Sequence, residues 1–355
     1  MTVTIDCRHL GSSGIGVYLQ GCLPYFLNTD NYFNLIGDSA KLEPLVSNCK
    51  NACILDCHIK PFSLQELFLF PFLSKINKSD LYFSPFFNIP QGIKVPVYTT
   101  IHDIVFPDMP GLVSGIGLSV RMWFYRRALK KSRKMFTVSE FSKSRIRHHL
   151  GTTKPIIVTH SAIQPMFIEY GANNHNVQKK QTIVFVGNIK KHKGLESLLD
   201  AFLSAKNEGL PHKLIIIGSE ENFRSSDNAV LNKINSAGTD AVSFTGFISD
   251  EQLMAHLAEA SLLVQPSLYE GFGLPPLEAM VLGTYALISD IPVFREIYAD
   301  YPVAFFRAGD TADLKDKLLE MLRRKNLEPL VLTKELSLRY TFEKTANVIL
   351  REWEA

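Results

Sequence analysis

Two glutamates eight residues apart, Glu270 and Glu278, stand in the segment of the sequence that is richest in residues able to do chemistry. Residues 266–280 read PSLYEGFGLPPLEAM, and the glycines permit a ligand to approach the backbone closely. Because proline is tolerated at the first helical position, the pattern predicts a strand, an open loop and a helix that starts near Pro276. The N–H groups at the start of that helix would suit a phosphate. The alternative is a plain strand–turn–helix in which Glu278 favours the helix dipole.

A second segment, residues 186–194, places lysines after a predicted strand and reads VGNIKKHKG. Its glycine and three lysines at a strand end could hold a polyanionic phosphate. The segment is not a P-loop, which requires Gly-Lys-Ser/Thr with wider glycine spacing. A solvated basic turn is the alternative interpretation.

A histidine and an aspartate, His102 and Asp103, follow a third predicted strand. The imidazole could polarise a substrate hydroxyl or act as an acid or base, whereas a structural or capping histidine is the alternative. The sequence has no Gly-x-Ser-x-Gly motif, so it offers no nucleophilic serine of the kind found in the catalytic triad of α/β-hydrolases.

The first predicted strand is followed by Gly14-Ile15-Gly16, which resembles a truncated dinucleotide fingerprint. The third glycine is absent because position 19 is leucine, and Asp30 alone near the expected ribose position is a weak indication of NAD. NAD binding is therefore not favoured.

Seven cations lie between Arg121 and Lys134, interleaved with aromatic and aliphatic residues, and no acid occurs between Asp108 and Glu140. A solvated helix face is the plain interpretation. An interfacial helix on an anionic membrane is the sharper one. Nucleic acid is the third, and no fold motif supports it.

The elements that would position these residues alternate between short apolar runs and amphipathic stretches, which predicts parallel sheets covered on both faces. Strands are expected in the first half at residues 2–5, 33–36, 81–84, 97–101, 134–138 and 156–159. In the second half they are expected at residues 182–186, 213–217, 242–245, 262–265 and 286–289. The pattern thus predicts an α/β fold of two Rossmann-like halves, with ligands in the cleft between them.

The expected domains are residues 1–170 and 180–337, joined by a polar linker at residues 169–181. A final amphipathic helix, about residues 340–355, carries an apolar stripe that needs a packing partner.

The composition fits this organisation, since 355 residues with 46% hydrophobic and 21% charged side chains can form two sizeable cores. The net charge of +3 argues against a general nucleic-acid binder.

Three cysteines recur every four residues without a common zinc spacing, which favours small core residues over a metal site: Cys49, Cys53 and Cys57. No secretory signal or membrane-spanning segment is visible, so we expect a soluble, cytoplasmic protein.

With these residues in view, the sequence resembles retaining glycosyltransferases of family 4, whose fold is GT-B. Residues 270–280 resemble the family's E-x7-E signature, and Gly14-Ile15-Gly16-Val17-Tyr18 is similar to its opening motif, with Val17 in place of an arginine. Four shorter segments resemble family elements in the same order: residues 100–103, residues 137–142, residues 186–194, and residues 242–247 together with 250–253.

The resemblance implies a role for each matching residue. Glu270 would contact the donor sugar, Glu278 the ribose hydroxyls and Lys193 the diphosphate, while His102 would bind the sugar near its reacting centre. The family's second phosphate cation is an arginine at the position of Asn188, so its role would pass to Lys190. The other implied donor contacts come from Gly187 and Phe247 and from the backbone of Gly271, Phe272, Gly273 and Leu274. Gly14 and Gly16 would line the acceptor side, and the last helix would cross back to the N-terminal domain.

The resemblance implies a metal-independent hexosyltransferase of the mannosyl- or rhamnosyltransferase branch that uses GDP-mannose or a similar donor and needs no cofactor. Its acceptor would be a glycan or lipid-linked oligosaccharide on the inner face of the cytoplasmic membrane, in surface polysaccharide or lipopolysaccharide synthesis. The membrane contact would be the peripheral one between Arg121 and Lys134, and no nucleic acid is expected. Three alternatives stay open: a UDP-sugar donor, a sugar-phosphate synthase with a soluble acceptor, and a non-catalytic scaffold that binds nucleotide sugar.

Overall fold

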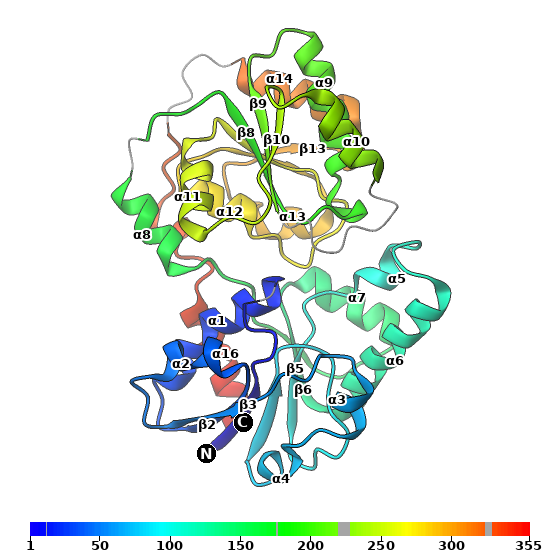
Figure 1. The fold of residues 1–355 in the computed structure, drawn as a ribbon, viewed down its shortest axis with the longest axis vertical. Coiled ribbons are helices and arrows are strands. Elements are labelled where there is room, and N and C mark those ends of the chain that lie inside the picture. The colour runs from blue at the N-terminus through cyan, green and yellow to red at the C-terminus, as the bar shows by residue number, and fades with distance from the viewer. Residues whose placement is uncertain (12, 175–176, 219–227, 324–328) are drawn as a thin grey trace. The chain divides into compact units, whose positions relative to one another are not determined.

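The computed structural model describes residues 1–11, 13–174, 177–218, 228–323 and 329–355 (Figure 1). These residues form two compact units. The N-terminal unit comprises Met1–Ala162 and Tyr340–Ala355, and the C-terminal unit comprises Ile163–Arg339. Each unit is built on its own parallel sheet, so the predicted α/β class with two Rossmann-like halves is confirmed.

The N-terminal unit contains a seven-stranded sheet in the order β3-β2-β1-β4-β5-β6-β7, in which all neighbours are parallel. The central strands β4 and β5 are buried along their whole length, as expected for apolar runs covered on both faces. The strands are β1 (Thr2–Asp6), β2 (Tyr32–Gly37), β3 (Ala52–Asp56), β4 (Leu81–Ser84), β5 (Val97–Thr100), β6 (Ser132–Thr137) and β7 (Ile156–Val158).

The helices of this unit connect successive strands and include the last helix of the chain. They are α1 (Ser13–Leu27), α2 (Ser39–Val46), α3 (Leu64–Phe68), α4 (Leu73–Ile76), α5 (Val105–Asp108), α6 (Gly115–Lys131), α7 (Glu140–Leu150) and α16 (Phe342–Glu354).

The last helix, α16, packs against α1, so the predicted return of the C-terminus to the first half is confirmed (Figure 1). Gly21 makes the close approach possible, because a Cβ atom there would lie 2.3 Å from the ring of Phe342. At the other end of the helix, the ring centroid of Trp353 lies 4.8 Å from that of Phe26 and 5.4 Å from that of Phe83. The apolar stripe seen in the sequence therefore lies in the core of the N-terminal unit.

The C-terminal unit contains a six-stranded parallel sheet in the order β10-β9-β8-β11-β12-β13. Its core packs around Phe185, Leu198 and Val264, which are fully buried. The strands are β8 (Thr182–Val186), β9 (Lys213–Ile217), β10 (Val242–Phe244), β11 (Leu262–Gln265), β12 (Ala286–Ser289) and β13 (Ala304–Phe306).

The helices of the C-terminal unit again alternate with its strands. They are α8 (Pro165–Asn173), the short 3-10 helix η1 (Lys191–Lys193), α9 (Leu195–Asn207), α10 (Asn228–Ala237), α11 (Asp250–Glu259), α12 (Pro275–Val281), α13 (Pro292–Ile297), α14 (Thr311–Leu322) and α15 (Lys334–Ser337).

The expected linker differs from the structure over its first part. Residues 169–173 belong to α8, which starts with a proline at its first turn and buries Phe167 and Gly171. A Cβ atom on Gly171 would lie 2.3 Å from the carbonyl oxygen of Val281, so α8 packs tightly on α12 of its own unit. The division between the units falls after Ala162, before this helix.

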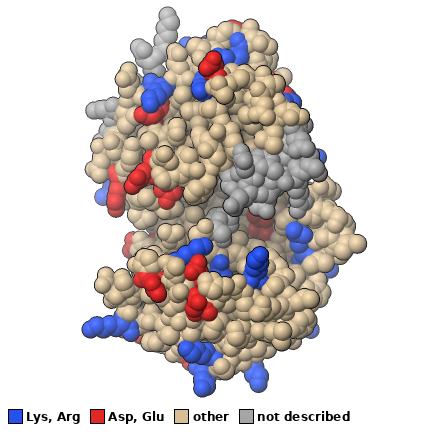
Figure 2. Space-filling view, in the orientation of Figure 1, with Lys and Arg blue, Asp and Glu red and all other residues tan. Residues whose placement is uncertain are grey.

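Lysine, arginine, aspartate and glutamate side chains are scattered over both units on the face drawn in Figure 2, and wide uncharged areas separate them. This distribution agrees with the net charge of +3. Within the described residues, every helix is too short or too polar to span a lipid bilayer.

Candidate functional site

An ion pair between Lys193 and Glu270 lies where two neighbouring strands of the C-terminal sheet end. Lys193 follows β8 and Glu270 follows β11, and these strands are paired in parallel. The Nζ atom of Lys193 donates to both carboxylate oxygens of Glu270, at 2.7 and 2.8 Å. The structure therefore brings together two residues that the sequence had placed in separate candidate segments.

The Glu270 carboxylate is also held by groups that the sequence interpretation did not assign. Ser267 Oγ donates to Glu270 Oε1 at 2.8 Å, and Gln265 Nε2 donates to Ser267 Oγ at 3.1 Å. Gln265 and Ser267 are completely buried. The sequence did contain a signal for these two residues. Gln265 ends an otherwise apolar strand, and Ser267 stands three residues before Glu270. The network fixes the direction of the carboxylate.

Two glycines let the loops around this ion pair come close together. Gly194 has a φ of +69°, and a Cβ atom there would lie 2.0 Å from the carbonyl oxygen of Pro266, which joins the β8 loop to the β11 loop. Gly273 has a φ of +82°, and its Cβ atom would lie 2.4 Å from the ring of Phe294. The Tyr298 hydroxyl donates to the Gly273 carbonyl, a contact that no sequence pattern indicated.

The segment between Glu270 and α12 contains the other predicted donor contacts. Phe272 is buried, while Gly271, Gly273 and Leu274 are partly exposed. The helix begins at Pro275, one residue before the predicted start.

The second glutamate of the pair, Glu278, lies in the first turn of α12. Burial, together with the nearby charge of Asp250 on α11, raises the pKa of Glu278 to about 7. A carboxyl group with this pKa exchanges its proton near neutral pH.

The lysine-rich loop after β8 presents exposed polar groups beside the ion pair. Asn188 and Lys190 are exposed, and Gly187 is partly exposed. His192 is partly buried, and burial together with the charge of Lys193 lowers its pKa to about 4, so this ring is neutral near pH 7. Phe247, which directly follows Gly246 in the turn after β10, exposes 88% of its surface.

In the N-terminal unit, His102 follows β5 with its ring held in one tautomer. Its Nε2 atom lies 3.0 Å from the Pro85 carbonyl oxygen, which can only accept, so Nε2 donates and Nδ1 is left as an acceptor. The Tyr18 ring packs edge-on at 4.9 Å. Burial lowers the pKa of His102 to about 4, so the imidazole is neutral at physiological pH. Asp103 accepts a hydrogen bond from the N–H of Val105, the first residue of α5.

The two glycines at the start of α1 differ in their surroundings. A Cβ atom on Gly14 would have no atom of the described residues within 4 Å, whereas one on Gly16 would lie 2.5 Å from the carbonyl oxygen of His9. Gly14 thus faces open space, and Gly16 is required by the backbone turn beside it. Gly16 therefore has a structural role, and the expectation that both glycines line a ligand site stays a prediction.

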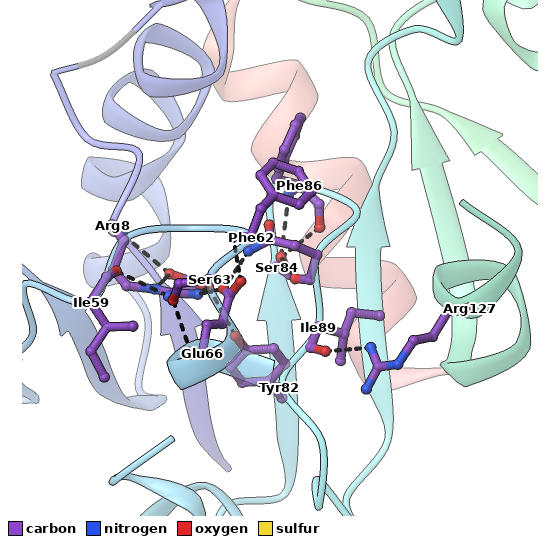
Figure 3. Close-up of polar contacts among 12 residues, drawn as sticks. Arg8, Ile59, Phe62, Ser63, Glu66, Tyr82, Ser84, Phe86, Ile89 and Arg127 are labelled. Carbon is purple, nitrogen blue, oxygen red and sulfur yellow. Dashed lines mark hydrogen bonds and ion pairs between the residues drawn. The ribbon is translucent and has the colours of Figure 1, made fainter. Parts of the chain in front are cut away.

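A buried ion cluster lies at the end of β1 in the same unit (Figure 3). Arg8 donates to Asp6 at 2.5 Å and also to Glu66 of α3, and both carboxylates are almost completely buried. Asn88 also donates to Glu66, and the Tyr82 hydroxyl donates to Asp6 at 3.0 Å. Burial raises the pKa of Asp6, but the charge and hydrogen bonds of Arg8, together with the nearby His9, outweigh burial, and the net shift is downward. No sequence motif signalled this cluster, because Arg8 and Glu66 are 58 residues apart.

Among the described residues, one group brings three possible metal ligands within 4.8 Å of one another: Asp38, Asp56 and His58. The group lies at the ends of β2 and β3. Asp38 caps α2, and Asp56 accepts the Ser39 N–H at 2.9 Å, so both carboxylates already have local structural roles.

The predicted site residues therefore form two groups, each described within its own unit. The C-terminal group is Gly187, Asn188, Lys190, Lys193, Phe247, Glu270, Gly271, Phe272, Gly273, Leu274 and Glu278. The N-terminal group is Gly14, Gly16 and His102.

Residues 168–330 match the family of glycosyl transferases group 1, and this segment is nearly the whole C-terminal unit. The Lys193–Glu270 pair and the glycine loops at the carboxyl ends of β8 and β11 all lie within the matched segment. The C-terminal unit is therefore a group 1 glycosyltransferase domain, and the resemblance seen in the sequence is confirmed at this level.

Two curated relatives are bacterial mannosyltransferases of O-antigen chains. The chain is 27% identical over 250 residues to O-antigen chain mannosyltransferase B of Escherichia coli, a match that covers 67% of this chain and 62% of the relative. It is 28% identical over 206 residues to O-antigen chain mannosyltransferase RfbU of Salmonella typhimurium, a match that covers 56% and 53%. The matched parts thus span just over half of each relative's length.

A similarity in structure extends over the whole chain. Sucrose-phosphate synthase from Thermosynechococcus elongatus superposes with a TM-score of 0.74 and covers 100% of this chain and 98% of its own, at 15% sequence identity. At this identity the likeness defines the fold, which is GT-B as predicted.

Proposed function

We propose that this chain is a glycosyltransferase that moves mannose or a similar hexose from a nucleotide sugar, GDP-linked, to a glycan or lipid-linked acceptor in surface polysaccharide synthesis. The observation that carries the proposal is the Lys193–Glu270 pair at the carboxyl edge of a group 1 glycosyltransferase domain. The two mannosyltransferase relatives support the choice of sugar and pathway.

The proposed reaction breaks the bond between the anomeric carbon and the diphosphate oxygen and forms a bond to an acceptor hydroxyl. Negative charge then develops on the departing diphosphate, where Lys193 and the exposed Lys190 would stabilise it. The acceptor proton would pass to the departing phosphate oxygen, so that atoms and charge balance without a separate base. This front-face route retains the configuration at the anomeric carbon.

The carboxylates would have different tasks in this reaction. Glu270, oriented by Ser267 and Lys193, would face the sugar near the positive charge that develops at the anomeric carbon. Glu278 would accept hydrogen bonds from the two ribose hydroxyls. His102, neutral and with Nδ1 as its acceptor, would bind a sugar hydroxyl rather than supply a charge.

The proposal includes retention and independence from metal ions, and two measurements address them. NMR of the product should show the same anomeric configuration as the donor, and an inverted product would overturn the front-face route. Activity should persist in a chelator such as EDTA, because lysine charge takes the place of a divalent cation at the diphosphate. Loss of activity that Mg²⁺ or Mn²⁺ restores would overturn that part.

The test of the function is transfer activity in a Glu270→Gln variant. We expect activity to fall about a thousandfold, the size of effect that follows loss of one group aimed at developing charge, while the fold is retained. The matched control is Glu259→Gln, because Glu259 also pairs with a lysine of the C-terminal unit, Lys180, at 2.6 Å but lies at the end of α11. Equal activity in the two variants would contradict the proposed role of Glu270.

The same assay separates the alternatives when donors and acceptors are varied. Turnover with UDP-sugars alone would replace the GDP-linked donor, and turnover with a soluble sugar phosphate would indicate a synthase. Binding of nucleotide sugar without transfer to any acceptor, in the wild type and the Glu270→Gln variant alike, would identify a scaffold.

A further inference from the structure

The N-terminal unit exposes a group of large apolar side chains, here called the apolar face, on two neighbouring elements. Around α3 they are Phe62, Leu64, Phe68 and Leu69, and on α6 they are Ile116, Val120 and Trp123. Leu64, Leu69 and Ile116 expose 77%, 73% and 81% of their surface, respectively. An apolar group of this extent on a protein surface indicates a binding site.

The helix α3 is inverted relative to an ordinary surface helix, because it buries its acid and exposes its apolar residues. Glu66 is only 2% exposed and is held by Arg8 and Asn88, and it also accepts the Phe62 N–H at 2.7 Å (Figure 3). The buried ion cluster thus fixes α3 with Leu64 and Phe68 directed to solvent.

The helix α6 continues the apolar face. Ile116, Val120 and Trp123 follow one another at intervals of four and three residues, which places them on one side of the helix, while Tyr125 and Ala128 are buried on the other. The Phe62 and Phe124 rings lie 5.1 Å apart and join the two elements. Gln91 joins them again, because its N–H donates to the Leu67 carbonyl and its side chain accepts from Arg127.

The exposed side of α6 changes from apolar to cationic along its length. After Trp123 the exposed positions are Arg126, Lys130 and Lys131, followed by Arg133 in the next strand. The other cations of this stretch have structural partners: Arg121 lies over the Phe106 ring, Arg127 donates to the Ile89 carbonyl, and Lys134 pairs with Glu352 at 2.8 Å. The predicted basic surface between Arg121 and Lys134 therefore reduces to four exposed cations.

We propose that the apolar face and these four cations bind the surface of an anionic lipid bilayer. The apolar side chains would enter the boundary between headgroups and acyl chains, and the cations would contact lipid phosphates. The positive charge favours an anionic bilayer over a second copy of the chain as the binding partner. If two copies paired through this face, their cations would lie close together, and residues 109–139 contain no acid to offset them. The inference goes beyond the proposed function, because lipid binding requires neither donor nor transfer.

The test is sedimentation of the full chain with vesicles of phosphatidylcholine alone or with added phosphatidylglycerol, in the absence of nucleotide sugar. We expect binding to the anionic vesicles that weakens with salt. Because each cation near a bilayer adds about a fivefold affinity, K130Q/K131Q should lose about 25-fold, and L64S/F68S should lose at least about tenfold. Matched controls are K50Q/K78Q, which removes two exposed lysines of the same unit, and V331S, which removes an exposed apolar residue of the C-terminal unit.

Tryptophan fluorescence gives a second readout. The chain has two tryptophans, of which Trp123 is 49% exposed on the apolar face and Trp353 is buried. Anionic vesicles should shift the emission of the wild type to the blue and leave a W123F variant unchanged. Equal binding to both vesicle types, variants that bind like the wild type, or concentration-dependent self-association through this face in place of lipid binding would overturn the proposal.

Discussion

At the carboxyl edge of the C-terminal sheet, Lys193 and Glu270 form an ion pair that solvent can reach, with side chains 22% and 10% exposed. At the same edge of the N-terminal sheet, Arg8 and Glu66 form an ion pair with side chains only 2% and 3% exposed. The first pair is anchored by a buried serine and glutamine yet leaves its cation accessible. The second is enclosed by Asn88 and Tyr82.

This difference in solvent exposure indicates a different role for each of the two ion pairs. A partly exposed pair can exchange its partner for a phosphate or sugar, and we assign it to chemistry. A fully enclosed pair costs much to break, and we assign it to holding α3 in place. One unit therefore leaves part of its ion pair exposed, where we propose that a donor binds, while the other buries charge and exposes apolar residues.

The largest effect on folding should come from breaking the enclosed pair. Arg8→Met leaves Asp6 and Glu66 buried without their cation, which should lower the free energy of unfolding by about 3–5 kcal/mol. Urea unfolding followed by tryptophan fluorescence reports this unit, because Trp123 and Trp353 both belong to it. The control is Lys134→Met, which breaks the partly exposed pair with Glu352 and should cost about 0.2–1 kcal/mol. If the two variants lost similar amounts of unfolding free energy, the proposed difference between the enclosed and the accessible ion pair would be wrong.

A smaller effect should separate the two glycines of α1. Gly16→Ala places a Cβ atom 2.5 Å from the His9 carbonyl oxygen and should lower the free energy of unfolding by about 1–3 kcal/mol. Gly14→Ala adds its methyl group to open space and should change stability by about 0.5 kcal/mol or less. If Gly14 lines the acceptor side, as the sequence resemblance implies, the Gly14→Ala variant should keep its stability but lose transfer activity. Equal stability of the two variants in thermal unfolding would contradict the assignment of Gly16.

A third prediction concerns pH and Glu278, whose pKa of about 7 lies above the ordinary 4.5. The proposed ribose contact needs the deprotonated carboxylate, and its fraction rises from about one tenth at pH 6 to about nine tenths at pH 8. Donor affinity measured by calorimetry should therefore rise about tenfold over that range, and Glu278→Gln should abolish the dependence. An affinity of the wild type that is constant from pH 6 to pH 8 would argue against this role.

The same raised pKa sets the sign of a stability effect. The folded chain binds more protons than the unfolded chain between about pH 4.5 and pH 7, so Glu278 contributes stability at low pH that is lost as the pH rises through this window. Glu278→Gln should remove that part of the slope.

The sequence predicted most of the sheet strands, because a parallel sheet buries its central strands on both faces and so requires continuous apolar runs. It did not indicate β3 or β13, which lie at sheet edges. The strand β13 has only three residues, and β3 contains a polar Asp56 and the partly buried Cys53. Edge strands are paired on one side only, so an apolar run does not mark every one of them; the other two edge strands, β7 and β10, were predicted.

The candidate site was predictable where its residues are close in sequence. Residues 186–194 and 266–280 carry their glycines, lysines and glutamates in compact runs, so pattern alone singled them out. The contacts between the runs, such as Lys193 with Glu270, arise from the pairing of β8 with β11. Arg8 with Glu66 and Tyr298 with Gly273 join residues far apart in sequence, and nothing local marks such pairs.

The central claim is that the accessible pair in the C-terminal unit belongs to a nucleotide-sugar site. Thermal unfolding of the wild type with GDP-mannose, set beside a panel of other GDP- and UDP-sugars, tests it most directly. A donor at about 100 times its Kd should add about 2.7 kcal/mol and raise the unfolding temperature by about 5–10 °C. A Lys193→Met variant should lose most of that rise. No rise with any nucleotide sugar, or an equal rise in the variant, would contradict the account.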